Sequence, residues 1–357
     1  MKKSEEKWYR NKDIVWLLVY GGALLIAIGV FYLIPPALSS TESVEPSEKK
    51  EKADLTADCE YQSPLDGVCL ENKDSMTLRP FGVMVENNID ARPVSGIDQA
   101  SIVFEAVAEG AITRFLAIFP GMAEVSQIGP VRSARPYYIN WAEEFDAVYA
   151  HVGGSPQALD QLGSAEVKNL DQFYNGRYFW RSADRYAPHN VYTSTELLRD
   201  ARRNNEWDDG EEFDAWPFKD DADKNDRPIS QSVTVHYNAY NYDVIWEYDP
   251  LDNGYLRFQS GKIYRTLAGQ SLSAKNVVVV YAEVAVIDDY GRLRTQTVGS
   301  GQAVLFQDGL AKPGVWKKES NQDRLSFFDE SGEEFQMNRG RTWINIVPDN
   351  YQEAEYQ

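Results

Sequence analysis

The sequence predicts an α+β protein that begins with a transmembrane helix, continues with an α/β domain and ends with a mostly β domain. Three observations predict this fold class. An uncharged apolar run stands near the N-terminus, strand-like and helix-like segments alternate through the first half, and short β-type runs separated by turn signals fill the second half. The 357 residues, 43% of them hydrophobic, suffice for two ordinary cores and exclude a disordered or collagen-like chain.

The apolar run extends from Ile14 to Ile34, and as a helix its 21 residues would span about 31 Å, the thickness of a bilayer core. Basic side chains are in excess before the run. We therefore expect residues 1–13 in the cytoplasm, residues 14–36 as a single-pass anchor in the cell membrane, and the remainder outside the cell membrane. A cleaved signal peptide is the alternative, since residues 37–39 resemble a cleavage site, but the run is longer than a signal peptide needs.

Residues 37–58 are polar and charged, which predicts a disordered tether. The two cysteines that follow, Cys59 and Cys69, bracket a turn containing proline and glycine. In an oxidising exterior compartment we expect them to form a disulfide. A metal site would need more ligands than two cysteines, and a pair of free buried thiols is the other alternative.

Residues 59–218 are predicted to form the α/β ectodomain, residues 219–230 an acidic linker, and residues 231–350 the β-rich C-terminal domain. In the ectodomain we expect strands at 81–85, 101–108, 112–119 and 147–152, and helices at 134–145, 155–162 and 194–204. In the C-terminal domain we expect strands at 233–237, 244–248, 255–258, 262–266, 276–287, 293–298, 303–306 and 342–346.

The net charge of −19 is the sum of +2 before the apolar run and −21 beyond it, and a surface this acidic excludes wholesale nucleic-acid binding. Clustered arginines are therefore notable. Residues 129–136 place two arginines at a strand-to-helix junction, where backbone N–H groups favour an anion, and residues 179–190 add two more and a histidine. These arginines could instead pair with the chain's own acids. The candidate ligand-binding residues are Arg132, Ser133, Arg135, His151, Ser155, Arg181, Arg185 and His189.

His151 and Ser155 follow a predicted strand, where ligands are often contacted in α/β sheets. His151 is either an acid–base group or a structural residue with satisfied hydrogen bonds. Ser155 is disfavoured as a nucleophile, because its motif is not G-x-S-x-G and Pro156 lacks a backbone N–H. Asp98 and Glu105 are candidate Mg²⁺ ligands, with pairing to Arg92 or Arg114 as the alternative.

Several of these segments are those of a known family. The runs RPFGVMVEN (79–87), ARPVSG (91–96), IGPVRSAR (128–135) and HVGGSP (151–156) closely resemble the YerB-like family of bacterial lipoproteins, a domain of unknown function. WEYD, FQDG and GVWK in the second half resemble that family's C-terminal domain. The resemblance implies a cell-envelope protein without a known activity. One departure is that no cysteine follows the apolar run, where a lipidated cysteine would stand.

A second resemblance bears on mechanism. The order of Glu86, Arg92 and Asp98 before Arg132 and Arg135 is similar to the LytR-CpsA-Psr phosphotransferases. That resemblance implies arginines on a polyprenyl pyrophosphate and acids on Mg²⁺.

The function expected from the sequence is a membrane-anchored extracytoplasmic protein that is not an enzyme and needs no cofactor. Its arginine-lined site would bind an anionic or glycan ligand or a wall-synthesis partner. The alternative is an Mg²⁺-dependent phosphotransferase acting on a polyprenyl pyrophosphate-linked glycopolymer, with Arg132, Arg135 and Arg181 on the pyrophosphate and Asp98 or Glu105 on the metal. Residues 14–34 would contact the membrane, and nucleic acid is not expected as a partner.

Overall fold

The computed structural model describes residues 59–164, 167–208, 210, 213–237, 239 and 241–357. The predicted cytoplasmic segment 1–13, membrane anchor 14–36 and tether 37–58 lie outside the described residues. Within the described ranges, no helix is long and apolar enough to cross a membrane. This finding does not extend to residues 14–36, so the structure gives no support to the predicted single-pass topology.

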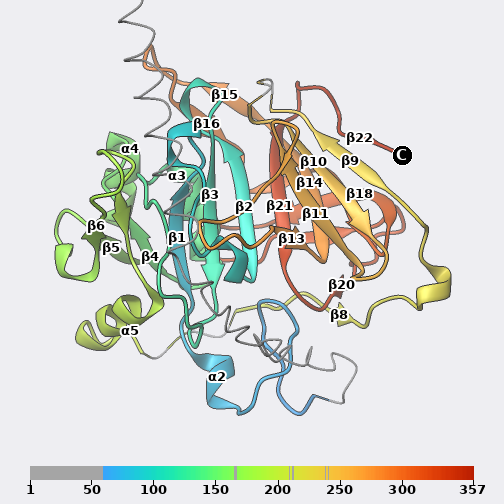
Figure 1. Ribbon diagram of the computed structural model, residues 1–357, viewed down its shortest axis with the longest axis horizontal. Coiled ribbons are helices and arrows are strands. Elements are labelled where there is room, and N and C mark those ends of the chain that lie inside the picture. The colour runs from blue at the N-terminus through green and yellow to red at the C-terminus, as the bar shows by residue number, and fades with distance from the viewer. Residues whose placement is uncertain (1–58, 165–166, 209, 211–212, 238, 240) are drawn as a thin grey trace, which may run out of the picture. The chain divides into compact units, whose positions relative to one another are not determined.

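A mixed ten-stranded sheet runs through the described part of the chain (Figure 1). Its order is β19-β18-β17-β14-β21-β2-β3-β1-β4-β5, so strands from both halves of the sequence share it. Its strands are β1 (Phe81–Glu86), β2 (Ile102–Val107), β3 (Thr113–Phe119), β4 (Val148–His151), β5 (Lys168–Asp171), β14 (Asn276–Ala282), β17 (Gly299–Gln307), β18 (Leu310–Lys318), β19 (Ser326–Phe328) and β21 (Thr342–Pro348).

The pairing in this sheet joins the two halves of the chain. β1, β2 and β3 pair antiparallel, and β4 and β5 then add in parallel beyond β1. On the other side, β2 pairs in parallel with β21, with Val103 beside Trp343. β21 pairs in parallel with β14. The central strands are buried on both faces, which explains why β1 reads as an almost unbroken apolar run.

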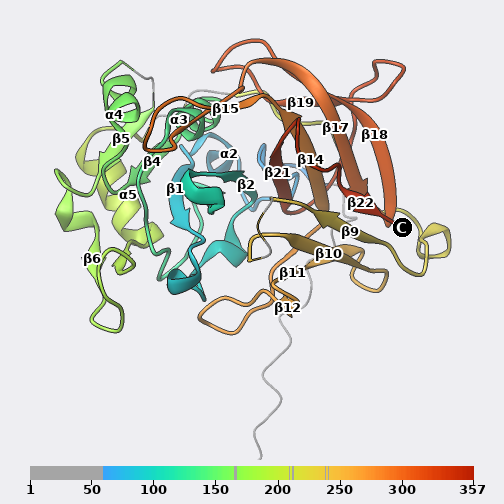
Figure 2. The same cartoon turned by 90° about the horizontal axis from the view of Figure 1, so that it is seen from above.

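A six-stranded sheet and three two-stranded ribbons complete the β structure (Figures 1 and 2). The six-stranded sheet contains β9 (Ser232–Val235), β10 (Val244–Asp249), β11 (Gly254–Gln259), β12 (Lys262–Ile263), β13 (Ser273–Ala274) and β22 (Glu355–Tyr356). The ribbons are β6 (Trp180–Arg181) with β7 (Val191–Tyr192), β8 (Phe218–Lys219) with β20 (Met337–Asn338), and β15 (Val284–Val286) with β16 (Leu293–Thr295).

Four α-helices are described, and all are short: α2 (Asp74–Thr77), α3 (Pro136–Glu143), α4 (Pro156–Leu162) and α5 (Thr195–Asn204). The side chain of Ser194 caps α5 by accepting a hydrogen bond from the Leu197 N–H at 3.2 Å. One face of the large sheet packs against α3 and α4, and the other packs against α5 and the six-stranded sheet.

The predicted fold class is wrong. The individual strands and helices expected in the first half are present, but the described chain is mostly β with few helices. β1 and β2 both pair antiparallel with β3, which lies between them, and short helices of about two turns stand between β3 and β4 and between β4 and β5. The strands of the second half extend the same sheet through β2 and β21, a pairing between residues far apart in the sequence.

The predicted disulfide is confirmed. Cys59 and Cys69 are bonded, with their Cα atoms 5.3 Å apart. The bracketed turn closes through the Ser63 N–H, which donates to the Val68 carbonyl at 2.9 Å. The disulfide therefore fixes the chain at its entry into the folded part.

Candidate functional site

The candidate site lies at the end of β1, where the loop leading into α3 crosses the neighbouring strands. Backbone hydrogen bonds hold this loop: the Arg132 N–H donates to the Met84 carbonyl at 2.9 Å and the Val131 N–H to the Val191 carbonyl at 2.7 Å. The loop thereby brings arginines beside charged groups of three other segments. We call the following six residues the arginine cluster: Glu86, Glu109, Arg114, Arg132, Arg135 and His189.

Glu86 occupies the centre of one half of the cluster. It is the last residue of β1 and is almost fully buried. Its Oε1 accepts a hydrogen bond from Arg132 Nε at 3.0 Å, and its Oε2 lies 2.9 Å from His189 Nδ1. A buried carboxylate needs such partners to offset its lost hydration. Glu86 therefore fixes Arg132 and His189, which come from different loops, next to each other.

Glu109 occupies the centre of the other half. Its Oε1 accepts a hydrogen bond from Arg135 Nε at 2.5 Å, and its Oε2 lies 3.7 Å from an Nη atom of Arg114. Burial favours the protonated acid, but the hydrogen bond from Arg135 and the charges of Arg135 and Arg114 outweigh burial, so the pKa of Glu109 is lowered. Glu109 is therefore ionised at neutral pH.

Arg114 links the two halves. It stands opposite Glu86 in the pairing of β1 with β3, and its Nη1 donates to the Ser133 carbonyl at 2.8 Å. Burial lowers the pKa of Arg114, and the nearby charge of Arg135 lowers it further. A guanidinium nevertheless remains protonated at neutral pH. Three guanidiniums thus meet two carboxylates, and the cluster carries a net positive charge even with His189 neutral.

Arg132 is the member that still has free donors. Only its Nε bonds to Glu86, and in the described part of the chain neither of its Nη atoms forms a hydrogen bond. Its side chain is 24% exposed.

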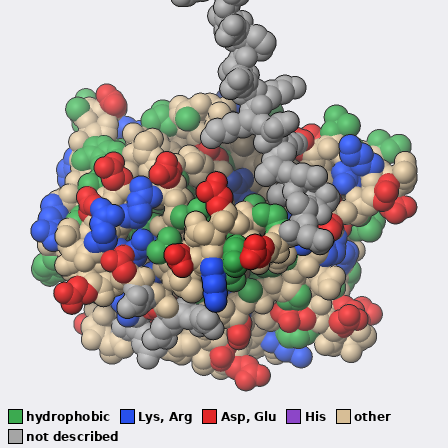
Figure 3. Space-filling view, turned by 90° about the horizontal axis from the view of Figure 1, so that it is seen from below, with side chains coloured by type: hydrophobic (Ala, Val, Ile, Leu, Met, Phe, Trp, Pro, Cys, Tyr) green, Lys and Arg blue, Asp and Glu red, His purple; other side chains and the backbone are tan. Residues whose placement is uncertain are grey.

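Basic side chains also gather on the face seen from below, towards the side that carries α5, with acidic side chains among them (Figure 3).

The other two predicted arginines lie outside the cluster. Arg181 donates from Nη1 to Asn190 Oδ1 at 2.8 Å. Arg185 donates to the backbone carbonyls of Ala91 and Pro93. The first bond closes the β6–β7 loop beside His189, and the bonds of Arg185 hold that loop against the segment after β1.

Three further predicted residues have structural contacts. His151 is fully buried, and its ring nitrogens each lie 2.8 Å from an oxygen, one of the Gly153 carbonyl and one of the Asn169 side chain. Ser155 caps α4, because its Oγ accepts a hydrogen bond from the Ala158 N–H. Ser133 contributes the backbone carbonyl that Arg114 bonds.

Of the two candidate metal ligands, Glu105 has its carboxylate bonded to other side chains, and Asp98 has a bond to its backbone carbonyl. Both carboxylate oxygens of Glu105 accept hydrogen bonds from Arg257, at 2.8 and 2.9 Å, and Thr113 Oγ1 donates at 2.8 Å. The backbone carbonyl of Asp98 accepts a hydrogen bond from Arg341. Among the residues that the structure describes, no group of three His, Cys, Asp or Glu side chains could hold a metal ion.

Arg257 is a buried charged residue that the sequence analysis missed. It is fully buried, and the rings of Phe115, Trp246, Tyr264 and Trp343 surround its guanidinium at 4.6 to 5.9 Å. It lies on the inward face of β11, where strand alternation calls for an apolar side chain. Two signals could have indicated the pair of Glu105 with Arg257: a glutamate within the apolar strand β2 and an arginine at an inward position of β11.

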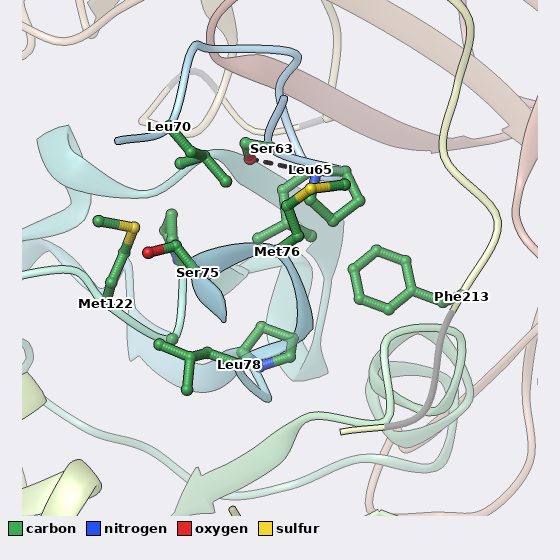
Figure 4. Close-up of a pocket in the computed structure, with 12 residues that line it drawn as sticks. Ser63, Leu65, Leu70, Ser75, Met76, Leu78, Met122 and Phe213 are labelled. Atoms are coloured by element: carbon green, nitrogen blue, oxygen red, sulfur yellow. Dashed lines mark hydrogen bonds between the residues drawn. The ribbon is translucent and has the colours of Figure 1, made fainter. Parts of the chain in front are cut away.

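An apolar cavity of about 20 Å³, room for one water molecule, lies apart from these charged groups (Figure 4). Figure 4 shows that Met76, Leu78 and Phe213 line it together with the turn at Ser63 and Leu65. It presents few polar groups. We therefore interpret it as a small gap where the entry segment packs on the rest of the fold.

Comparisons with known proteins match both halves of the chain. The model of the "Protein of unknown function (DUF3048) N-terminal domain" matches residues 65–208, and that of the C-terminal domain matches residues 233–344. The Bacillus subtilis (strain 168) protein described as "Putative lipoprotein YerB" is 35% identical over 326 residues, which are 90% of this chain and 93% of that protein. The crystal structure of YerB from Bacillus subtilis superposes with a TM-score of 0.74 at 33% identity, covering 83% of this chain and 99% of that one.

Proposed function

The chain belongs to the DUF3048 family, which includes YerB, and from this premise we propose that it is an extracytoplasmic envelope protein whose arginine cluster binds an anionic ligand. The resemblance to the YerB-like family is confirmed, and the family has no assigned activity. The proposal therefore rests on the chemistry of the cluster.

Two observations support a location in the envelope. The relative YerB is described as a lipoprotein, a class held at the membrane by an attached lipid. The Cys59–Cys69 disulfide is the second, because disulfides persist in oxidising compartments and are rare in the cytosol. Both favour a folded part that lies outside the cytoplasm.

The observation that carries the binding proposal is the free end of Arg132. Glu86 orients the side chain through Nε and leaves both Nη atoms for a ligand. Arg135 lies on the same loop and adds a second positive charge, also oriented by its Nε. A phosphate or carboxylate that meets two preoriented guanidiniums gains charge-assisted hydrogen bonds without the cost of ordering those side chains.

The same contacts favour binding over Mg²⁺-dependent transfer. Glu105, one of the two acids (with Asp98) that this reaction could use on the metal, is bonded to Arg257 and Thr113. His151 has both ring nitrogens occupied. Neither residue is free to hold a metal or move a proton at the arginine cluster.

The test is calorimetric titration of the purified full-length chain in detergent with inorganic pyrophosphate. We expect the wild type to bind. Arg132→Gln should bind at least about tenfold more weakly, because a hydrogen bond to a charged group contributes ~1.5–3 kcal/mol. Arg294→Gln is the matched control, since Arg294 is an exposed arginine in an ion pair with Glu283. Absence of binding by the wild type, or equal binding by all three proteins, would refute the proposal.

A further inference from the structure

The segment 172–190, between β5 and β7, presents aromatic side chains to solvent. Phe173, Tyr174 and Tyr186 are 68%, 87% and 92% exposed. Most large side chains of the first half are buried in the two cores. Figures 1 and 2 both draw β6, the middle of this segment, at the outer edge of the side that carries β4 and β5. We call residues 172–190 the aromatic segment.

We propose that the aromatic segment extends the arginine cluster into a binding surface for an anionic polysaccharide. Sugar rings would stack on Phe173, Tyr174 and Tyr186, and phosphate or carboxylate groups of the polymer would meet the arginines. The inference rests on the proposed function and names the class of its ligand.

Phe173 adjoins the loop that carries Arg132. Its ring covers Gly153: a Cβ built on that glycine would lie 2.8 Å from the ring, and the glycine has a φ of +56°. The Gly153 carbonyl accepts a hydrogen bond from the Ala134 N–H at 2.9 Å, and the Gly153 N–H donates to Asp171 at 2.9 Å. These bonds fix the start of the aromatic segment next to the loop before α3.

The far end of the segment adjoins the cluster through His189. The His189 N–H donates to the Tyr186 carbonyl at 3.0 Å, which closes the turn, while the His189 ring contacts Glu86. Arg185 anchors the same turn on the carbonyls of Ala91 and Pro93. Tyr186 is thus held three residues from a member of the arginine cluster.

The charge of the aromatic segment also suits an anionic polymer. Within the described part of the chain, Arg177, Arg181 and Arg185 form no ion pair with a carboxylate. Their recorded partners are the Tyr178 hydroxyl, the Asn190 side chain and backbone carbonyls. In a chain of net charge −19, three such arginines within nine residues leave positive charge for a ligand.

The composition favours a carbohydrate over a protein partner. The three exposed aromatics are interspersed with polar residues, including Gln172, Asn175 and Ser182, and of the three only Phe173 and Tyr174 are adjacent in the sequence. The core of a protein interface is apolar and depleted in charge. Exposed rings with hydroxyl-binding neighbours match a chain of sugars, whose C–H faces pack on the electron-rich face of an aromatic ring.

The test is affinity electrophoresis of the full-length chain in gels that contain polygalacturonate, a phosphorylated mannan or neutral dextran. The variants are Phe173→Ala/Tyr186→Ala and, as the matched control, Tyr290→Ala, which removes a side chain 81% exposed on the β15–β16 ribbon. We expect retardation by one or both anionic polymers and not by dextran. The double variant should bind about tenfold more weakly, and Tyr290→Ala should bind as the wild type does.

Pyrophosphate titration of the same proteins separates the two proposals. The double variant should keep the pyrophosphate affinity of the wild type, because its arginines are intact. Normal retardation of the double variant would overturn the inference and leave the proposed function standing. Absence of pyrophosphate binding by the wild type would overturn both the inference and the proposed function. A third outcome is that no polymer retards the wild type, but the wild type retains an envelope protein that the double variant does not. That outcome would assign the surface to a protein partner and refute the inference.

Discussion

Glu105→Gln should destabilise the protein strongly, because it removes one charge of a fully buried ion pair. Glu105 and Arg257 are both 0% exposed, and they join β2 of the first half to β11 of the second. The substitution keeps the shape of the side chain but leaves the guanidinium uncompensated among four aromatic rings. Breaking a buried pair from one side costs ~3–5 kcal/mol. We expect the free energy of unfolding to fall by this amount.

The assay is urea unfolding of the full-length chain, monitored by tryptophan fluorescence. Trp246 and Trp343 contact Arg257, so their emission responds to the environment of the ion pair. Replacing both partners, as Glu105→Leu/Arg257→Met, should cost less than Glu105→Gln alone, because no buried charge is left unpaired. Glu283→Gln is the control at the exposed pair with Arg294 and should cost under about 1 kcal/mol. A loss below about 1 kcal/mol for Glu105→Gln would refute the reasoning.

Three further predictions concern other parts of the chain. Burial would raise the pKa of Asp308, but hydrogen bonds from neighbouring side chains outweigh it and hold this pKa at about 2. The ionised Asp308 therefore contributes ~2 kcal/mol to the free energy of unfolding above pH 4, and this contribution is lost as pH falls towards 2. Asp308→Asn should reduce this acid sensitivity in urea titrations at pH 7 and pH 2.5, and an unchanged pH dependence would contradict the assignment. Cys59→Ser/Cys69→Ser should lower stability by ~2–3 kcal/mol, whereas an unchanged urea midpoint in non-reducing buffer would show that the disulfide does not stabilise the fold. Gly153→Ala should displace Phe173 and weaken polymer retardation without weakening pyrophosphate binding; equal retardation would contradict that placement.

Local patterns predicted elements well where one segment determined them. The apolar run of 81–85 became β1, and the serine before 195 caps α5, because periodicity and capping act within a few residues. β18 was missed, because Pro313 and Gly314 interrupt its pattern. Pro313 is tolerated there because β19 pairs only with Val315–Lys317.

The fold class was missed because it depends on distant pairing. Nothing local indicates that β2 pairs with β21 or that Glu105 meets Arg257. The site was predicted in part for the same reason. The sequence grouped Arg132 with Arg135. The placement of His189 beside Glu86, and the bond of Arg181 to Asn190, depend on how the β6–β7 loop docks on the segment after β1.

The central claim is that Arg132 presents preoriented donors to an anion beside the positive charge of Arg135, and a crystal structure of the full-length chain with pyrophosphate tests it most directly. The account predicts a phosphoryl oxygen about 2.7–2.9 Å from an Nη atom of Arg132, with the Arg132 Nε still bonded to Glu86. Pyrophosphate bound elsewhere with the cluster empty, or Arg132 turned away from Glu86 to reach it, would contradict the account.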